Sequence, residues 1–294
     1  MLEIYGMTQG KLEKTGEEGC AKRATERRLI TMNLLQLQPI LVLQPDIVWE
    51  NKEANHLIWQ RLLEQARPAP GTLVVLPEMA ASGFTMNPAA SAEGPERLSE
   101  SVCARLAELW KVHLICGLVS ESTEWWGRNQ SVVFSPDGGE VARYTKMQLF
   151  TLGGEAQCHI PGDEIVVTTI NGVRTALFIC YDLRFPELFR EAVRQGAELF
   201  VVIANWPAKR IDHWTTLLRA RAIENQAWVV GVNRVGTDPS QIYSGQSIIV
   251  DCHGVIHADA GGEEGFASAQ MDIEGQRKWL TDFPALQDRR FGTL

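Results

Sequence analysis

The amino-acid sequence predicts an α/β fold in which helices cover β-sheets within a single domain. From residue 32 onward, apolar runs of strand length alternate with amphipathic segments of helix length. A strong hairpin signal, Pro136–Asp137–Gly138–Gly139, joins two of the apolar runs, so antiparallel strands are expected beside the alternating units. No linker, repeat or low-complexity block interrupts this order, which favours one domain.

Residues 1–30 do not fit the alternation. The stretch EKTGEEGCAKRATERR carries many charges and no apolar period, so it offers little to bury. Met32 then begins an apolar run. We therefore predict a flexible N-terminal extension over residues 1–30 and a single domain over residues 31–294. A structured amphipathic arm is the alternative for the first segment.

The first half of the domain is expected to contain five strands and two helices. Two apolar sets fall at helical spacing and should face the core: Leu57, Ile58, Leu62 and Leu63 in the first helix, and Leu98, Val102, Leu106 and Leu109 in the second. The run over 72–76 is short and apolar throughout, as expected of a buried strand. The expected elements are a strand over 34–43, a helix over 51–67, a strand over 72–76, a helix over 96–111, a strand over 112–119 and hairpin strands over 130–135 and 140–146.

The second half repeats the alternation after an irregular segment over 149–164. Its first apolar run ends at Cys180, and Pro186 suits the first turn of a helix, where its missing N–H is no loss. The tail over 278–294 contains Pro284 and several charged residues, so we expect it to pack across a neighbouring subunit or to lack fixed structure. The expected elements are a strand over 176–179, a helix over 185–195, a strand over 197–204, a helix over 212–225 and strands over 227–233, 247–250, 254–257 and 265–271.

Composition and charge exclude several classes of protein. The net charge of -8 disfavours a nucleic-acid partner, and no apolar run approaches the ~18 residues of a membrane span. The first thirty positions lack the apolar core of a signal peptide. The six cysteines are scattered without a C-x-x-C pair, which disfavours a zinc site and a disulfide framework. We expect a cytoplasmic enzyme that acts on a small molecule.

Three of the expected strands end in reactive side chains, Glu78, Lys146 and Cys180. Each alone is weak evidence, because a strand-end Glu or Lys is usually solvated and a Cys is often a small buried hydrophobe. Together they supply what amide hydrolysis needs: a carboxylate to take the thiol proton, a sulfur nucleophile and an ammonium for the oxyanion. The position of Cys180 beside a helix start favours its thiolate form.

The sequence around these residues resembles the nitrilase (carbon–nitrogen hydrolase) superfamily. The matching stretches are LVVLPEMAASGF, YTKMQLF and ICYDLRFPELFR, in the order in which that family places its Glu–Lys–Cys triad. The likeness is greatest to the omega-amidase branch. It implies a four-layer αββα sandwich with two sheets covered by helices, a homodimer or higher homo-oligomer, and no cofactor. It also implies hydrolysis of the terminal amide of small 2-oxo acid amides such as 2-oxoglutaramate and 2-oxosuccinamate.

The resemblance assigns roles to five residues. Cys180 is the nucleophile that forms a thioester, and Glu78 is the general base to the thiol and then the acid to ammonia. Lys146 and the backbone N–H of Tyr181 stabilise the oxyanion. Glu155 matches a second carboxylate found in many members, and it is expected to hold Lys146 and to position the substrate.

Phe84 and Trp206 are expected to wall the pocket, with ordinary core aromatics as the alternative. Asp182 and Arg184 are interpreted mainly as structural pairing groups that fix the turn after the nucleophile. Relatives often have His where this chain has Gln148, which bears on substrate choice because Gln cannot titrate.

Three other functions remain open at the level of sequence. A nitrilase or an N-carbamoyl amino acid amidohydrolase would use the same kind of residues. A non-catalytic scaffold of this fold is also conceivable, although the intact Glu78, Lys146 and Cys180 count against it.

Overall fold

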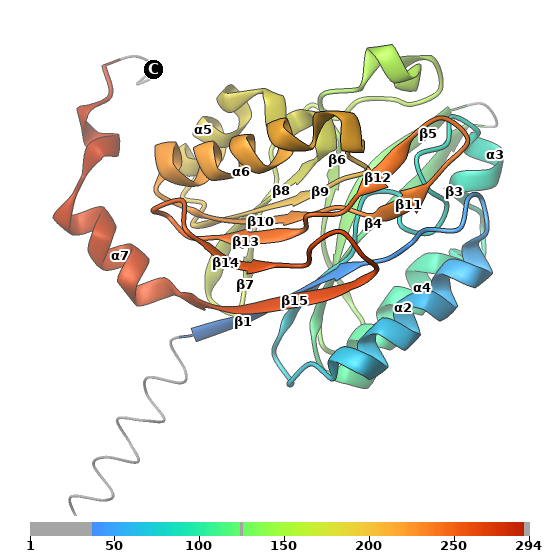
Figure 1. Cartoon of the computed structure of the whole chain (residues 1–294), viewed down its shortest axis with the longest axis horizontal. Helices are drawn as coiled ribbons and strands as arrows, with labels where there is room; N and C mark the ends of the chain where they lie inside the picture. Colours follow the sequence, from blue (N-terminus) through green and yellow to red (C-terminus); the bar gives the residue numbers. More distant parts are fainter. Residues whose placement is uncertain (1–36, 124–125, 291–294) are drawn as a thin grey trace, which may run out of the picture. The chain divides into compact units, whose positions relative to one another are not determined.

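Two mixed β-sheets carry the fold (Figure 1). A computed structural model describes residues 37–123 and 126–290 of the chain. The expected extension over residues 1–30 therefore lies outside the described residues. Residues 38–294 group into one compact unit, and everything below concerns that unit.

The first sheet has a parallel centre and an antiparallel hairpin at one side. Strands β1, β2 and β4 pair in parallel, and β5 and β6 follow with the turn predicted at Pro136–Gly139. Strand β15 lies beside β1 at the other edge, and the short β3 pairs with β4. The bounds are β1 (Leu37–Gln44), β2 (Leu73–Val75), β3 (Ala92–Glu93), β4 (His113–Thr123), β5 (Trp126–Phe134), β6 (Glu140–Thr145) and β15 (Gly265–Asp272).

The second sheet has the same design, with three parallel strands between antiparallel edges. Strands β8, β9 and β10 are parallel, while β7 pairs antiparallel with β8 and β13 pairs antiparallel with β10. A separate hairpin, β11 with β12, follows β10. The bounds are β7 (Val167–Ile170), β8 (Val173–Ile179), β9 (Leu199–Ile203), β10 (Trp228–Val232), β11 (Val235–Thr237), β12 (Ile242–Ser244), β13 (Ile248–Val250) and β14 (Ile256–Asp259).

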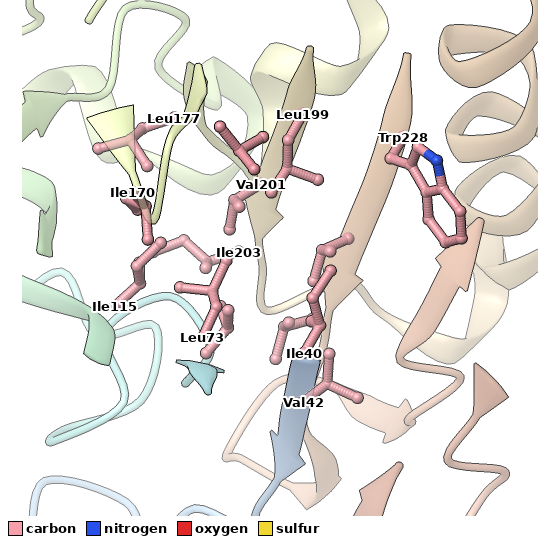
Figure 2. Close-up of a cluster of buried hydrophobic side chains, with 14 of the residues drawn as sticks. Ile40, Val42, Leu73, Ile115, Ile170, Leu177, Leu199, Val201, Ile203 and Trp228 are labelled. Carbon is pink, nitrogen blue, oxygen red and sulfur yellow. The ribbon is translucent and has the colours of Figure 1, made fainter. Parts of the chain in front are cut away.

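Alternation along the strands divides the interior into three cores and four layers. On β1, Ile40 and Val42 point into a core between the sheets, while Leu41 and Leu43 point to the helices on the opposite face. Figure 2 shows the core between the sheets, where residues of β1, β2 and β4 meet residues of β7, β8, β9 and β10. Because every central strand is buried on both faces, its sequence is apolar almost throughout.

Two pairs of helices form the outer layers. Helices α2 and α4 cover the first sheet and α5 and α6 cover the second (Figure 1). The helix bounds are α2 (Lys52–Ala66), α3 (Pro88–Ser91), α4 (Leu98–Trp110), α5 (Pro186–Arg194), α6 (Ile211–Asn225) and α7 (Ile273–Asp282). Helix α2 begins where the Asn51 side chain accepts a bond from the Ala54 N–H, and it ends at Arg67, which adopts a left-handed conformation.

Some sequence expectations about the helices are wrong. Leu57 and Leu109 are exposed, at 65% and 74%. Leu62 and Leu106 are buried as expected, and Trp59, which was not expected there, completes the buried face of α2. Leu98 starts α4 and is also exposed. A period of 3.6 residues accommodates more than one apolar stripe, and only packing selects between them.

Several elements were not expected from the sequence. Strand β7 and the β11–β12 hairpin are too short and too polar to stand out as apolar runs. Part of the tail is also ordered: α7 begins at the Asp272 cap, whose side chain accepts a bond from the Gly275 N–H, and continues to Asp282. None of the helices in the described part of the chain is both long and apolar enough to cross a membrane.

Candidate active site

The ends of three strands bring Glu78, Lys146 and Cys180 together. Glu78 lies three residues beyond β2, Lys146 follows β6 directly and Cys180 follows β8 directly. The first two strands belong to one sheet and β8 belongs to the other, so the site lies where the two sheets face each other. Ligand sites in open α/β sheets occur at such carboxyl ends of strands.

Glu78, Lys146 and Glu155 form an ion cluster without solvent access. The Lys146 Nζ lies 2.8 Å from Glu78 Oε1, and it lies 3.0 Å and 2.8 Å from Glu155 Oε1 and Oε2. All three side chains have no exposed surface. Glu155 comes from a 3-10 turn (Glu155–Gln157) within the segment expected to be irregular, and its Oε2 accepts a bond from the Phe150 N–H at 2.7 Å.

Two asparagines that sequence reasoning missed complete this cluster. The Asn129 Nδ2 donates to Glu78 Oε1 at 2.7 Å and to Glu155 Oε1 at 2.9 Å. The backbone N–H of Asn205 donates to Glu78 Oε2 at 2.8 Å, and its side-chain amide donates to the Glu78 carbonyl at 2.7 Å. Asn129 could have been found by counting back through the predicted hairpin, since it lies opposite Lys146.

Cys180 occupies a strained turn. Its φ angle is 48°, in the left-handed region that residues with a Cβ rarely adopt, and its Sγ lies 4.0 Å from the Asn205 carbonyl oxygen. Unlike the buried cysteines at 103, 116, 158 and 252, Cys180 is only half-buried. Cys180 is among the residues that line the pocket described below.

A fully buried carboxylate, that of Asp182, secures this turn. Asp182 accepts bonds from the Ile179 N–H at 2.9 Å, the Gln148 N–H at 2.8 Å and the Tyr144 hydroxyl at 2.7 Å. Arg184 is not its partner: its guanidinium lies 4.8 Å from the Trp206 ring centre, beside the pocket. Asp182 therefore has the structural role expected of it at this turn, whereas Arg184 lies beside the pocket instead.

The charges of the cluster set its protonation states. Burial alone would lower the pKa of Lys146, but the carboxylates of Glu155 and Glu78 outweigh this effect and raise it. Burial alone would raise the pKa of Glu155, but Lys146 and the bond from Asn129 lower it. Lys146 is therefore a permanent cation and Glu155 a permanent anion at neutral pH.

The nucleophile candidate is a neutral thiol at rest. Burial, followed by the nearby Glu78 carboxylate, raises the pKa of Cys180 well above its usual range. The expectation of a thiolate favoured by a helix start is wrong, since Cys180 itself begins a five-residue 3-10 turn (Cys180–Arg184) and α5 starts only at Pro186. The thiol consequently needs a base in order to react.

A pocket of about 450 Å³ opens beside Cys180. Phe84, Tyr181 and Trp206 are among its lining residues, whereas Glu155 and Gln148 are not. The Phe84 ring, which lines the pocket, has its centre 5.3 Å from the Lys146 Nζ.

The outer wall of the pocket is cationic. Arg184, Lys209 and Arg210 line it, and among the described lining residues there is no Asp or Glu. Burial, followed by the like charge of Arg210, lowers the pKa of Arg184. This wall is suited to an anionic group.

Residues 34–280 match the family described as Carbon-nitrogen hydrolase. The chain belongs to this family. It is 38% identical over 254 residues to a protein of Yersinia enterocolitica named omega-amidase YafV, a match that covers 85% of this chain and 95% of the relative. It is 33% identical over 219 residues to the 2-oxoglutaramate amidase of Bacillus subtilis (strain 168), covering 74% of this chain and 85% of the relative.

Solved structures of carbon–nitrogen hydrolases share the fold. The XC1258 protein of Xanthomonas campestris, described as a CN-hydrolase superfamily protein with an arsenic adduct in its active site, superposes with a TM-score of 0.78 at 30% identity, covering 88% of this chain and 99% of its own. Nit3 of Saccharomyces cerevisiae, of the nitrilase superfamily, gives 0.78 at 26% identity, covering 87% and 97%. The expected superfamily, the nitrilase-type fold and the omega-amidase-like class of hydrolase are confirmed.

Proposed function

We propose that this carbon–nitrogen hydrolase is an omega-amidase that cleaves the terminal amide of small 2-oxo acid amides, 2-oxoglutaramate or 2-oxosuccinamate, to the acid and ammonia. The observation that carries the proposal is the arrangement of Cys180 at the pocket beside the Glu78–Lys146–Glu155 cluster. The names of the two relatives, omega-amidase and 2-oxoglutaramate amidase, support the substrate class.

The chemistry follows from the protonation states. Glu78 takes the proton of the neutral Cys180 thiol as the sulfur attacks the amide carbon. The Lys146 ammonium and the Tyr181 backbone N–H stabilise the negative oxygen that forms. The C–N bond then breaks, ammonia leaves with the proton from Glu78, and a thioester remains. Water, deprotonated by Glu78, hydrolyses the thioester and restores the thiol.

Glu155 acts on Lys146 rather than on the substrate in this scheme. Its carboxylate contacts the ammonium through both oxygens and is bonded to the Phe150 N–H, so it fixes the direction of the Lys146 side chain. Phe84 and Trp206 shape the pocket, which suits a small linear amide.

The cationic wall favours a 2-oxo acid amide over the parent amino acid. A carboxylate at the far end of the substrate can pair with Arg184 or Arg210. An α-ammonium would instead enter a pocket that already holds these two cations and Lys209, and like charges repel. Glutamine and asparagine are therefore expected to be poorer substrates than 2-oxoglutaramate and 2-oxosuccinamate.

Release of ammonia from a matched panel tests the proposal. The panel contains the two 2-oxo acid amides, glutamine, asparagine, a simple nitrile and an N-carbamoyl amino acid. We expect the highest kcat/KM for a 2-oxo acid amide. Faster turnover of the nitrile or the N-carbamoyl compound would overturn the omega-amidase proposal.

Alkylation separates an enzyme from a scaffold of the same fold. In a Cys20→Ser background, iodoacetamide should label Cys180 selectively and abolish activity, because the other four cysteines are buried. Cys180→Ala should have no activity and Cys180→Ser less than about a hundredth of wild type, since Glu78 is poised for a thiol. Cys252→Ala serves as the matched control and should keep full activity.

A further inference from the structure

Asn129 is the cross-strand partner of Lys146. The β5–β6 ladder ends with the pair Gln130 and Thr145, and the Lys146 N–H donates to the Asn129 carbonyl at 2.9 Å one position further. Side chains of directly opposed residues lie on the same face of a sheet, close together. The hairpin register therefore delivers an amide side chain to the ion cluster together with the ammonium.

The two N–H groups of that amide both bind carboxylates. They contact Oε1 of Glu78 and Oε1 of Glu155, the oxygens that also accept from the Lys146 Nζ. The Asn129 Oδ1, in contrast, is buried and has no hydrogen-bond partner among the described residues. A buried carbonyl without a partner is unfavourable, so the favourable interactions of this side chain are the hydrogen bonds that its two N–H groups donate.

The cluster needs such donors because it holds two carboxylates and one ammonium. Two carboxylates that share a dry site tend to retain one proton between them. Hydrogen bonds donated to both carboxylates favour the state in which both are ionised. A Glu78 that keeps a proton could not accept one from Cys180.

We propose that Asn129 is a positioning residue that keeps Glu78 ionised and aligned as the base for Cys180. The proposal rests on the proposed function and deepens it, since it adds a residue that contacts neither the substrate nor the sulfur. Asn129 is not among the described residues that line the pocket. Its effect is therefore transmitted through Glu78 and Glu155.

Among the titratable groups near Glu78, the Lys146 ammonium acts in the same direction as the Asn129 amide, because it donates to Glu78 Oε1 at 2.8 Å. The titratable groups that interact electrostatically with this cluster are Lys146, Glu155, Cys180, His159 and Tyr243. Burial lowers the pKa of His159, and burial raises the pKa of Tyr243, so both are neutral near pH 7. The remaining donor to the Glu78 side chain is the backbone N–H of Asn205.

The test replaces Asn129 with leucine, which has a similar size and no donors, and measures kcat/KM against pH. We expect kcat to fall about 10²-fold, with KM changed less than about threefold, and the acidic limb to move up by about one pH unit or more. The control is Gln130→Leu. Gln130 is the adjacent buried amide on the other face of β5, bonded to Thr145 Oγ1. The Gln130→Leu substitution should lower the melting temperature without moving the acidic limb of kcat/KM.

The rate of Cys180 alkylation against pH gives a readout that needs no substrate. Its acidic limb should move in the same direction in Asn129→Leu. If no 2-oxo acid amide is hydrolysed by wild type, the proposed function fails while alkylation still tests Asn129. Asn129→Ala, which removes the donors without adding a charge, replaces the leucine variant if that variant does not fold. The proposal would be overturned by a folded variant in which the acidic limb of kcat/KM and the acidic limb of the alkylation rate both stay at their wild-type pH.

Discussion

Replacing Lys146 with methionine shows what the buried ammonium contributes. Methionine fills a similar space without the charge, and it leaves Glu78 and Glu155 facing each other with no cation. The ammonium makes three contacts of 2.8–3.0 Å in a cluster with no exposed surface. Removing one partner of a buried ion pair costs ~3–5 kcal/mol of unfolding free energy at neutral pH. Loss of the oxyanion donor should also lower kcat by about 10²–10³-fold.

The contribution of this ion cluster to the pH dependence of stability should change sign in this variant. In wild type the pKa of Glu155 is lowered in the folded state, so its contribution is present above the unfolded pKa and is lost as the pH falls through the folded pKa. In Lys146→Met the two uncompensated carboxylates raise the pKa of one of them above the unfolded value of about 4.3. The folded variant then binds the extra proton, so it becomes more stable as the pH falls toward about 5.

Urea unfolding followed by tryptophan fluorescence at about pH 5, 6, 7 and 8 measures both effects. Lys278→Met is the control, because Lys278 pairs with Asp282 in an exposed position and should change stability by less than about 1 kcal/mol. A Lys146→Met protein as stable as wild type at neutral pH, with the wild-type pH slope, would refute the reasoning.

Three further predictions concern the base, the pocket wall and the N-terminal segment. Glu78→Gln should keep the melting temperature within a few degrees but lower kcat by about 10²-fold or more, and wild-type turnover would remove it from the mechanism. Arg210→Met should raise KM for 2-oxoglutaramate about tenfold and leave KM for an uncharged linear amide unchanged; equal changes for both substrates would speak against carboxylate binding. Deleting residues 1–28 should alter neither melting temperature nor activity, because that segment has no apolar period to bury, and a loss of several degrees would show that it docks.

The sequence alone determined the fold class and the residues that end its strands. Apolar runs buried on both faces, such as those that end at Glu78 and Cys180, are a local property of the chain, because a central strand in a covered sheet is apolar throughout. The hairpin turn at Pro136–Gly139 could likewise be predicted from neighbouring residues alone, since turn types depend on a few residues with restricted backbone angles. The motifs around Lys146 and Cys180 were enough to indicate the family.

Only the tertiary structure decided how these side chains affect one another. The neutral state of the Cys180 thiol depends on burial and on Glu78, which is far away in the sequence, so local reasoning from a helix start gave the wrong charge. Asn129 and Asn205 joined the cluster through strand register and through the approach of two sheets, neither of which a motif records. Protonation and hydrogen bonding in a dry site depend on distances of a few ångströms between groups from separate segments, and packing alone fixes those distances.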